Sequence, residues 1–133
     1  MTRRLYIFRH GETDWNREKR WQGHVDTQLN ELGRRQAQML KLMLENYGIQ
    51  AILSSDLIRA VSTAEIVASH LGVPLFQDRG IRETHFGDAE GLTYAEVEQK
   101  FGPAFVSQWR DPSTQDLDVC FPNGETKRQV YDR

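Results

Sequence analysis

The chain has 133 residues, 17 basic and 19 acidic side chains that nearly cancel, and a single cysteine, Cys120. This length allows one domain, and the balanced charge gives no reason to expect nucleic acid or an anionic membrane surface as a partner. One cysteine excludes an internal disulfide and fits a reducing compartment, while no apolar run approaches the roughly 20 residues of a membrane span. We therefore expect a cytoplasmic protein that binds neither nucleic acid nor membrane.

The first predicted elements are a strand, a loop and a helix. Arg4–Phe8 is rich in aromatic and branched side chains, which favours a first buried strand. Residues 11–28 show little periodicity and are predicted to form a surface loop. Apolar side chains then recur at helical spacing, so we expect a helix from the N-cap Asn30 to about Asn46, with Gly48 as its C-terminal stop.

The following elements continue this alternation. Ile49–Leu53 is predicted to be a second strand, and Ser54–Asp56 is predicted to cap a helix that ends at Gly72. Val73–Gln77 is expected to be a third strand, and Thr93–Glu96 has capping-box spacing ahead of a short helix. This order of elements predicts a layered α/β fold with largely parallel strands and right-handed crossovers.

Polar side chains with complementary chemistry follow the ends of the predicted strands. Arg9 and His10 follow the first strand, Arg59 lies in the first turn of the helix after the second, and Glu83 follows the third. Because ligands gather at the carboxyl ends of strands in an open α/β sheet, we expect these four residues to line one cavity. Two guanidinium groups there would bind a phosphoryl group and stabilise the charge that develops on its oxygens.

Four ordered blocks of the sequence resemble the histidine phosphatase superfamily, which contains phosphatases and cofactor-dependent phosphoglycerate mutases. In chain order these blocks are Arg9–Thr13 with Asn16, Ser54–Ala64, Glu83–Gly91 and Pro122–Thr126. The resemblance covers almost the whole chain. It implies a single domain over residues 1–133 with a phosphoglycerate mutase-like three-layer α/β/α sandwich around a mostly parallel central sheet.

The resemblance also implies how the site works. The roles that it assigns are nucleophile for His10, proton donor for Glu83, phosphate binding for Arg9 and Arg59, and further polar contacts with substrate for Asn16 and Gly23. A neutral imidazole nitrogen attacks phosphorus while a backbone carbonyl holds the other ring nitrogen as N–H. A carboxylic acid protonates the leaving alkoxide. No metal or cofactor is expected, because the guanidinium groups take the place of a cation.

The end of the chain departs from the family pattern. The family's second histidine, which also binds the phosphoryl group, has no counterpart before Arg133, and His24, His70 and His85 lie in a different context. We therefore expect a fragment or a naturally short member that lacks roughly the last third of the family's domain. The absent strand would lie beside the one ending at His10. We thus expect residues 1–133 not to form a self-sufficient, fully active monomer: either further chain or a partner, as in a homodimer, fills the open edge, or the isolated piece is unstable and nearly inactive.

Three functions fit these residues. The first is a phosphatase that hydrolyses a small phosphorylated metabolite through phosphohistidine, and the second is a cofactor-dependent phosphoglycerate mutase with the same site. The run Phe86–Thr93 resembles the phosphatase branch, and the short segment between Gly91 and Pro122 lacks the insertion typical of mutases, so the phosphatase is favoured. The third function, a non-catalytic phosphate-binding or regulatory domain, follows from the absent second histidine.

Overall fold

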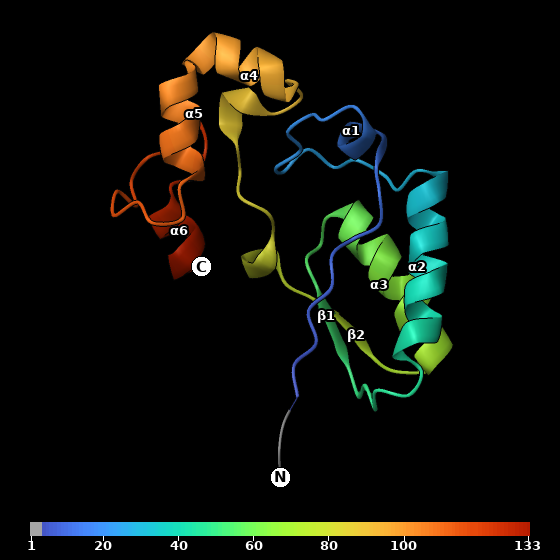
Figure 1. Cartoon of the computed structure of the whole chain (residues 1–133). Coiled ribbons are helices and arrows are strands. Elements are labelled where there is room, and N and C mark those ends of the chain that lie inside the picture. The colour runs from blue at the N-terminus through green and yellow to red at the C-terminus, as the bar shows by residue number, and fades with distance from the viewer. Residues whose placement is uncertain (1–3) are drawn as a thin grey trace.

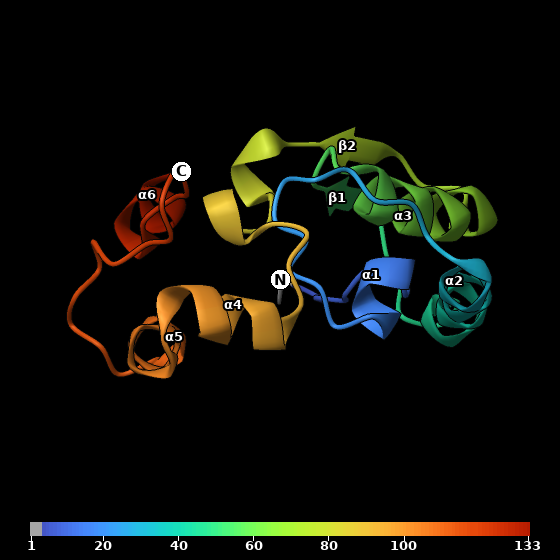
Figure 2. The ribbon, with the colours of Figure 1, turned by 90° about the horizontal axis from the view of Figure 1, so that it is seen from above.

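The structure, a computed structural model, describes residues 4–133 and places its elements in two groups (Figure 1). In chain order the elements are α1 (Asp14–Arg17), α2 (Glu31–Leu44), β1 (Ile52–Ser54), α3 (Ile58–Leu71), β2 (Leu75–Gln77), α4 (Tyr94–Phe101), α5 (Pro103–Arg110) and α6 (Lys127–Asp132), with single 3₁₀ turns at Arg79–Ile81 and Gly87–Ala89. Seen from above, α2, α3 and the strands lie on one side, and α4, α5 and α6 on the other (Figure 2).

The first group is a strand–helix–strand unit covered by a second helix. β1 and β2 pair in parallel with Ile52 opposite Leu75, and α3 connects them and packs against both. α2 packs against α3, and their shared apolar faces enclose a small core with the strands. The Asn30 side chain caps α2 as expected, and Gly72 ends α3 in the left-handed conformation. The predicted α/β class and parallel pairing are confirmed.

The prediction of a first strand at Arg4–Phe8 is wrong. Figure 1 draws this segment as a plain trace, and within residues 4–133 its backbone pairs with no other strand. A strand exists only through the hydrogen bonds that it makes with a neighbour, so apolar composition alone does not create one. Leu5 and Ile7 are 85% and 89% exposed, and the described sheet has two strands instead of the three predicted.

The predicted cap of α3 is also wrong, because the cap comes from a distant loop. The residue before the helix is Leu57, which makes no side-chain capping bond. Instead, the Ile58 N–H donates to Oδ1 of Asp26 at 2.6 Å. The carboxylate thus satisfies an amide that no residue in the run 54–56 satisfies, and it attaches the loop around Asp26 to the start of α3.

Capping boxes start three short helices, α1, α4 and α6. Thr93 and Glu96 form the predicted box at α4. A second box, between Thr13 and Asn16, starts α1 inside the segment predicted to be a loop. A four-residue helix contains too little periodicity to be recognised, and the reciprocal cap is what stabilises it.

The second group surrounds an aromatic cluster. The Trp21 ring meets Phe86 edge-on at 4.8 Å between centroids, and Trp109 and Phe121 at 5.2 and 5.3 Å. Val97 of α4 is fully buried in the same cluster, which therefore attaches α4 and α5 to the loop that follows α1. This packing positions the segment between β2 and α4, where Glu83 lies.

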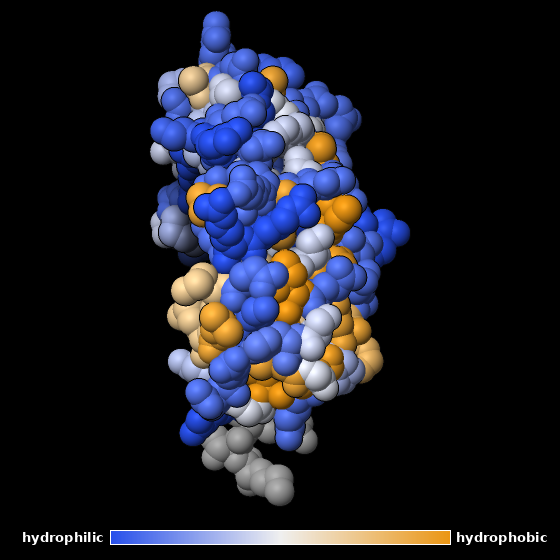
Figure 3. Space-filling view, turned by 90° about the vertical axis from the view of Figure 1, so that its right-hand side faces the viewer, coloured by the Kyte–Doolittle hydropathy of each residue, from blue (hydrophilic) through white to orange (hydrophobic). Residues whose placement is uncertain are grey.

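Apolar side chains also lie on the surface of the first group. Figure 3 shows the α2 side of the molecule, with apolar patches over its lower half. On α2 the exposed apolar side chains are Leu32, Met39, Leu42 and Met43. No helix within the described residues 4–133 is both long enough and apolar enough to cross a membrane.

Candidate active site

One cavity of about 540 Å³ brings together the four residues that the sequence singled out. Its lining includes Arg9, His10, Arg59 and Glu83. They come from the segment before α1, from the first turn of α3 and from the segment after β2. The four residues thus line one cavity, as expected from the sequence, although the segment that carries Arg9 and His10 is not a strand.

The His10 imidazole is held in one tautomer. Its Nδ1 lies 2.7 Å from the carbonyl oxygen of Gly11, which can only accept, so Nδ1 carries the proton and Nε2 keeps its lone pair. Burial lowers the pKa of His10 below its ordinary value of 6.5, against the opposing effect of this hydrogen bond, and the charges of Arg59 and Arg9 lower it further. The ring is therefore neutral at pH 7.

The loop that follows His10 is fixed to α3 by a buried hydroxyl. The Gly11 N–H donates to Oγ1 of Thr63 at 3.0 Å, and that hydroxyl donates to the Arg59 carbonyl at 2.8 Å. A side chain at Gly11 would also collide with the backbone of Gly33, because its Cβ would lie 2.3 Å from the Gly33 oxygen. Close backbone approach thus sets where the imidazole lies.

Arg59 is a buried cation whose orientation is set by backbone carbonyls. Its side chain is nearly inaccessible, and its two terminal nitrogens donate to the oxygens of Val25 and Gly23 at 2.9 and 2.8 Å. Burial lowers the pKa of Arg59, while the nearby carboxylates of Glu83 and Asp26 raise it. The remaining N–H groups can bind an anion at the positive end of the α3 dipole.

Glu83 is exposed at the cavity and is not the ion-pair partner of its neighbour. Its Oε1 accepts the N–H of Thr84 at 2.8 Å. The adjacent Arg82 instead makes a two-point contact with Asp56 at 2.5 and 2.6 Å. The carboxylate thus stays beside the cavity that also contains His10.

Asn16 and Gly23 do not line this cavity. The Asn16 Oδ1 accepts from the backbone and hydroxyl of Thr13 within the α1 cap. Gly23 is buried with φ +53°, and its carbonyl accepts from Arg59. Its contact with the site is therefore indirect, through the orientation of the guanidinium.

The sequence did not identify the contacts that hold this site together, although it singled out the residues that make them: Thr63 within a matched block, Asp26 as a residue that fixes its loop, and His24 as a histidine near the site. Thr63 lies one helical turn after Arg59 on the same face, which is a signal of contact. Asp26 and His24 lie far along the chain from the residues that they bind, and no local pattern identifies those partners.

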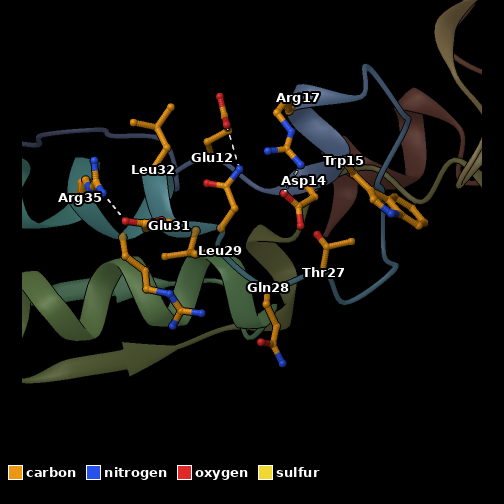
Figure 4. Close-up of a pocket in the computed structure, with 12 residues that line it drawn as sticks. Glu12, Asp14, Trp15, Arg17, Thr27, Gln28, Leu29, Glu31, Leu32 and Arg35 are labelled. Atoms are coloured by element: carbon orange, nitrogen blue, oxygen red, sulfur yellow. Dashed lines mark hydrogen bonds and ion pairs between the residues drawn. The ribbon is translucent and has the colours of Figure 1, made fainter.

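A larger hollow, of about 810 Å³, lies between α1 and the start of α2 (Figure 4). It contains none of the four residues above. Two ion pairs lie in it, Arg17 with Asp14 at 3.0 Å and Arg35 with Glu31.

Comparison with known proteins identifies the family. The family model described as "Histidine phosphatase superfamily (branch 1)" matches residues 5–133. The chain therefore belongs to the histidine phosphatase superfamily, in agreement with the resemblance of its sequence blocks.

Individual relatives include both phosphatases and mutase-like proteins. The chain is 41% identical to "Phosphoglycerate mutase-like protein 4" of Arabidopsis thaliana, over 97% of this chain and 56% of the relative. It is 40% identical to "Glucosyl-3-phosphoglycerate phosphatase" of Mycolicibacterium vanbaalenii, over 98% of this chain and 56% of the relative. A solved structure of mycobacterial glucosyl-3-phosphoglycerate phosphatase with VO3 superimposes with a TM-score of 0.83 at 37% identity, covering 92% of this chain and 56% of that one. The chain thus spans a little over half the length of these relatives.

Proposed function

We propose that this chain carries the phosphoryl-transfer site of a phosphatase that hydrolyses a small phosphomonoester through a phosphohistidine. One observation carries the proposal: the Gly11 carbonyl holds the proton of His10 on Nδ1, in a ring that burial keeps neutral. The lone pair of Nε2 is then available in a cavity that Arg9, Arg59 and Glu83 also line. A nucleophile, two cations and an acid together match the requirements of phosphate ester cleavage.

The reaction proceeds in two displacements. Nε2 of His10 attacks phosphorus, the P–O bond to the alcohol breaks, and the alkoxide takes a proton from Glu83. Water then attacks the phosphohistidine, gives its proton to the Glu83 carboxylate, and releases inorganic phosphate and the neutral imidazole. Arg9 and Arg59 offset the charge on the phosphoryl oxygens in both steps, so the scheme uses no metal. The single cysteine fits a cytoplasmic enzyme.

Two relatives support different acceptors for the phosphoryl group. The name of the mycolicibacterial relative supports hydrolysis and suggests a phosphorylated sugar acid as the first substrate to test. The name of the Arabidopsis relative supports a mutase, which would use the same residues but pass the phosphoryl group to another hydroxyl. The two functions differ in product, because only hydrolysis releases inorganic phosphate.

Leaving-group dependence tests the proposal. The full chain is assayed for phosphate release from an aryl phosphate with a good leaving group and from an alkyl phosphate, before and after Glu83→Gln. Only the alkyl substrate needs the proton when the phosphoenzyme forms, so the substitution should lower kcat/KM, which reports that first step, much more for the alkyl than for the aryl substrate. An equal fall in kcat/KM for both substrates would contradict Glu83 as the acid. Phosphate binding without turnover would instead favour a non-catalytic domain.

A further inference from the structure

His24 lies outside the cavity but holds the backbone of the proposed proton donor. Its Nε2 is 2.8 Å from the carbonyl oxygen of Glu83. That oxygen can only accept, so Nε2 carries a proton and donates it. The residues around Glu83 belong to no helix or strand, and the same carbonyl has one other donor, Arg133, at 3.0 Å. The position of Glu83 thus depends on a small number of side-chain contacts.

The His24 ring is itself held from several sides. Its backbone N–H donates to Oε1 of Glu90 at 2.9 Å, and the Phe86 N–H donates to the same oxygen at 3.0 Å. Its ring meets His85 edge-to-face with centroids 4.9 Å apart, and a carboxylate oxygen of Glu125 lies 3.7 Å from Nε2. Because these contacts already fix the imidazole, its hydrogen bond to the Glu83 carbonyl costs little side-chain entropy.

The same short loop also orients the phosphate-binding cation. The carbonyl of Gly23, immediately before His24, accepts from Arg59, and so does the carbonyl of Val25, immediately after it. Residues 23–25 therefore contact the guanidinium through two backbone oxygens and Glu83 through one side chain. Their geometry sets how far the proton donor lies from a phosphate held by Arg59.

We propose that His24 is a positioning residue that places the Glu83 carboxyl against the oxygen of the leaving group. The inference rests on the proposed role of Glu83. Misplacement of an acid by a fraction of an ångström weakens proton transfer but leaves phosphate binding intact. His24 should therefore affect turnover of substrates that need the proton, and not affinity for phosphate.

Three substitutions in the full chain separate this role from a merely structural one. His24→Phe keeps a ring against His85 but removes the donor, and His24→Gln restores an N–H at similar reach. His70→Phe is the matched control, because His70 is exposed on α3 and pairs with Glu45, away from the cavity. Each variant is assayed with the alkyl and the aryl phosphate, and its inhibition constant for inorganic phosphate is measured.

The expected result is selective. His24→Phe should lower kcat/KM, which reports formation of the phosphoenzyme, about tenfold on the alkyl phosphate, the size of effect expected from one lost hydrogen bond, and less than about twofold on the aryl phosphate. His24→Gln should recover most of the loss, His70→Phe should cause none, and phosphate inhibition should stay unchanged. In a Glu83→Gln background, His24→Phe should cost nothing further on the alkyl phosphate, because the group that it positions is gone.

Other outcomes would overturn the inference. Equal loss on both substrates, a weakened phosphate constant, or an undiminished effect of His24→Phe in the Glu83→Gln background would mean that His24 acts elsewhere. Selective loss from Glu83→Gln without one from His24→Phe would leave the proposed function standing and remove the positioning role. The amide resonance of Thr84, which donates to the Glu83 carboxylate, gives a readout independent of turnover. It should shift in His24→Phe and not in His70→Phe.

Discussion

A methyl group added at Gly23 tests whether the loop over Arg59 is held as tightly as its contacts indicate. The residue has φ +53°, in the left-handed region, and a Cβ there would lie 2.0 Å from Oε1 of Glu90. That carboxylate cannot simply move aside, because its side chain is 11% exposed and Oε1 accepts from the amides of His24 and Phe86. Gly23→Ala must therefore strain the backbone and break these hydrogen bonds.

The expected loss of stability has two parts that a control separates. The left-handed conformation costs an alanine about 1 kcal/mol relative to glycine. Displacing Glu90 weakens two hydrogen bonds to a charged acceptor, which adds about 3 kcal/mol. Gly48 has a similar φ of +66° and nothing within 4 Å of its Cβ position, so Gly48→Ala should carry the first cost alone.

Urea unfolding of the full chain, followed by tryptophan fluorescence, measures both variants against the parent. Gly23→Ala should lose about 4 kcal/mol and Gly48→Ala about 1 kcal/mol. Phosphatase activity should fall in the first variant only, because its loop orients Arg59. Equal destabilisation by the two substitutions would show that Glu90 yields freely and that the loop is not fixed by it.

Three further predictions follow from the structure. Burial lowers the pKa of His10, and the neutral imidazole is the proposed nucleophile, so the acid limb of kcat/KM against pH should have its midpoint below 6.5. A midpoint above 6.5 would contradict the burial argument. Asp26→Ala removes the acceptor of the Ile58 amide and should destabilise the fold by about 1 kcal/mol in urea unfolding, and no change would show that the cap is unimportant. The chain should self-associate through exposed apolar side chains such as Leu5 and Ile7. Sedimentation should therefore show species larger than a monomer, and Ile7→Lys should reduce them.

Local patterns predicted the elements that local forces determine. The N-cap Asn30, the periodic apolar face of α2 and the capping box at Thr93 act within a few residues, and each lies where the sequence places it. The four residues of the cavity were found for a related reason, since each follows a segment that ends at the same edge of the fold.

The sequence did not predict the contacts between residues that lie far apart along the chain. The cap of α3 comes from Asp26, 32 positions before Ile58, because a carboxylate on a facing loop competes successfully with the residues next to the helix. The hydrogen bond from His24 to Glu83 spans 59 positions. Arg4–Phe8 has a strand's composition, but strand formation requires a neighbour, and its own residues do not encode one.

Trapping of the phosphoenzyme tests the central claim most directly. The full chain is mixed with an aryl phosphate, quenched within milliseconds, and examined by ³¹P NMR and by mass spectrometry of its peptides. We predict an acid-labile, base-stable phosphoramidate on Nε2 of His10, absent from His10→Ala and accumulating in Glu83→Gln, where the attacking water lacks its base. Turnover without a phosphorylated His10, or the same intermediate in His10→Ala, would contradict the account.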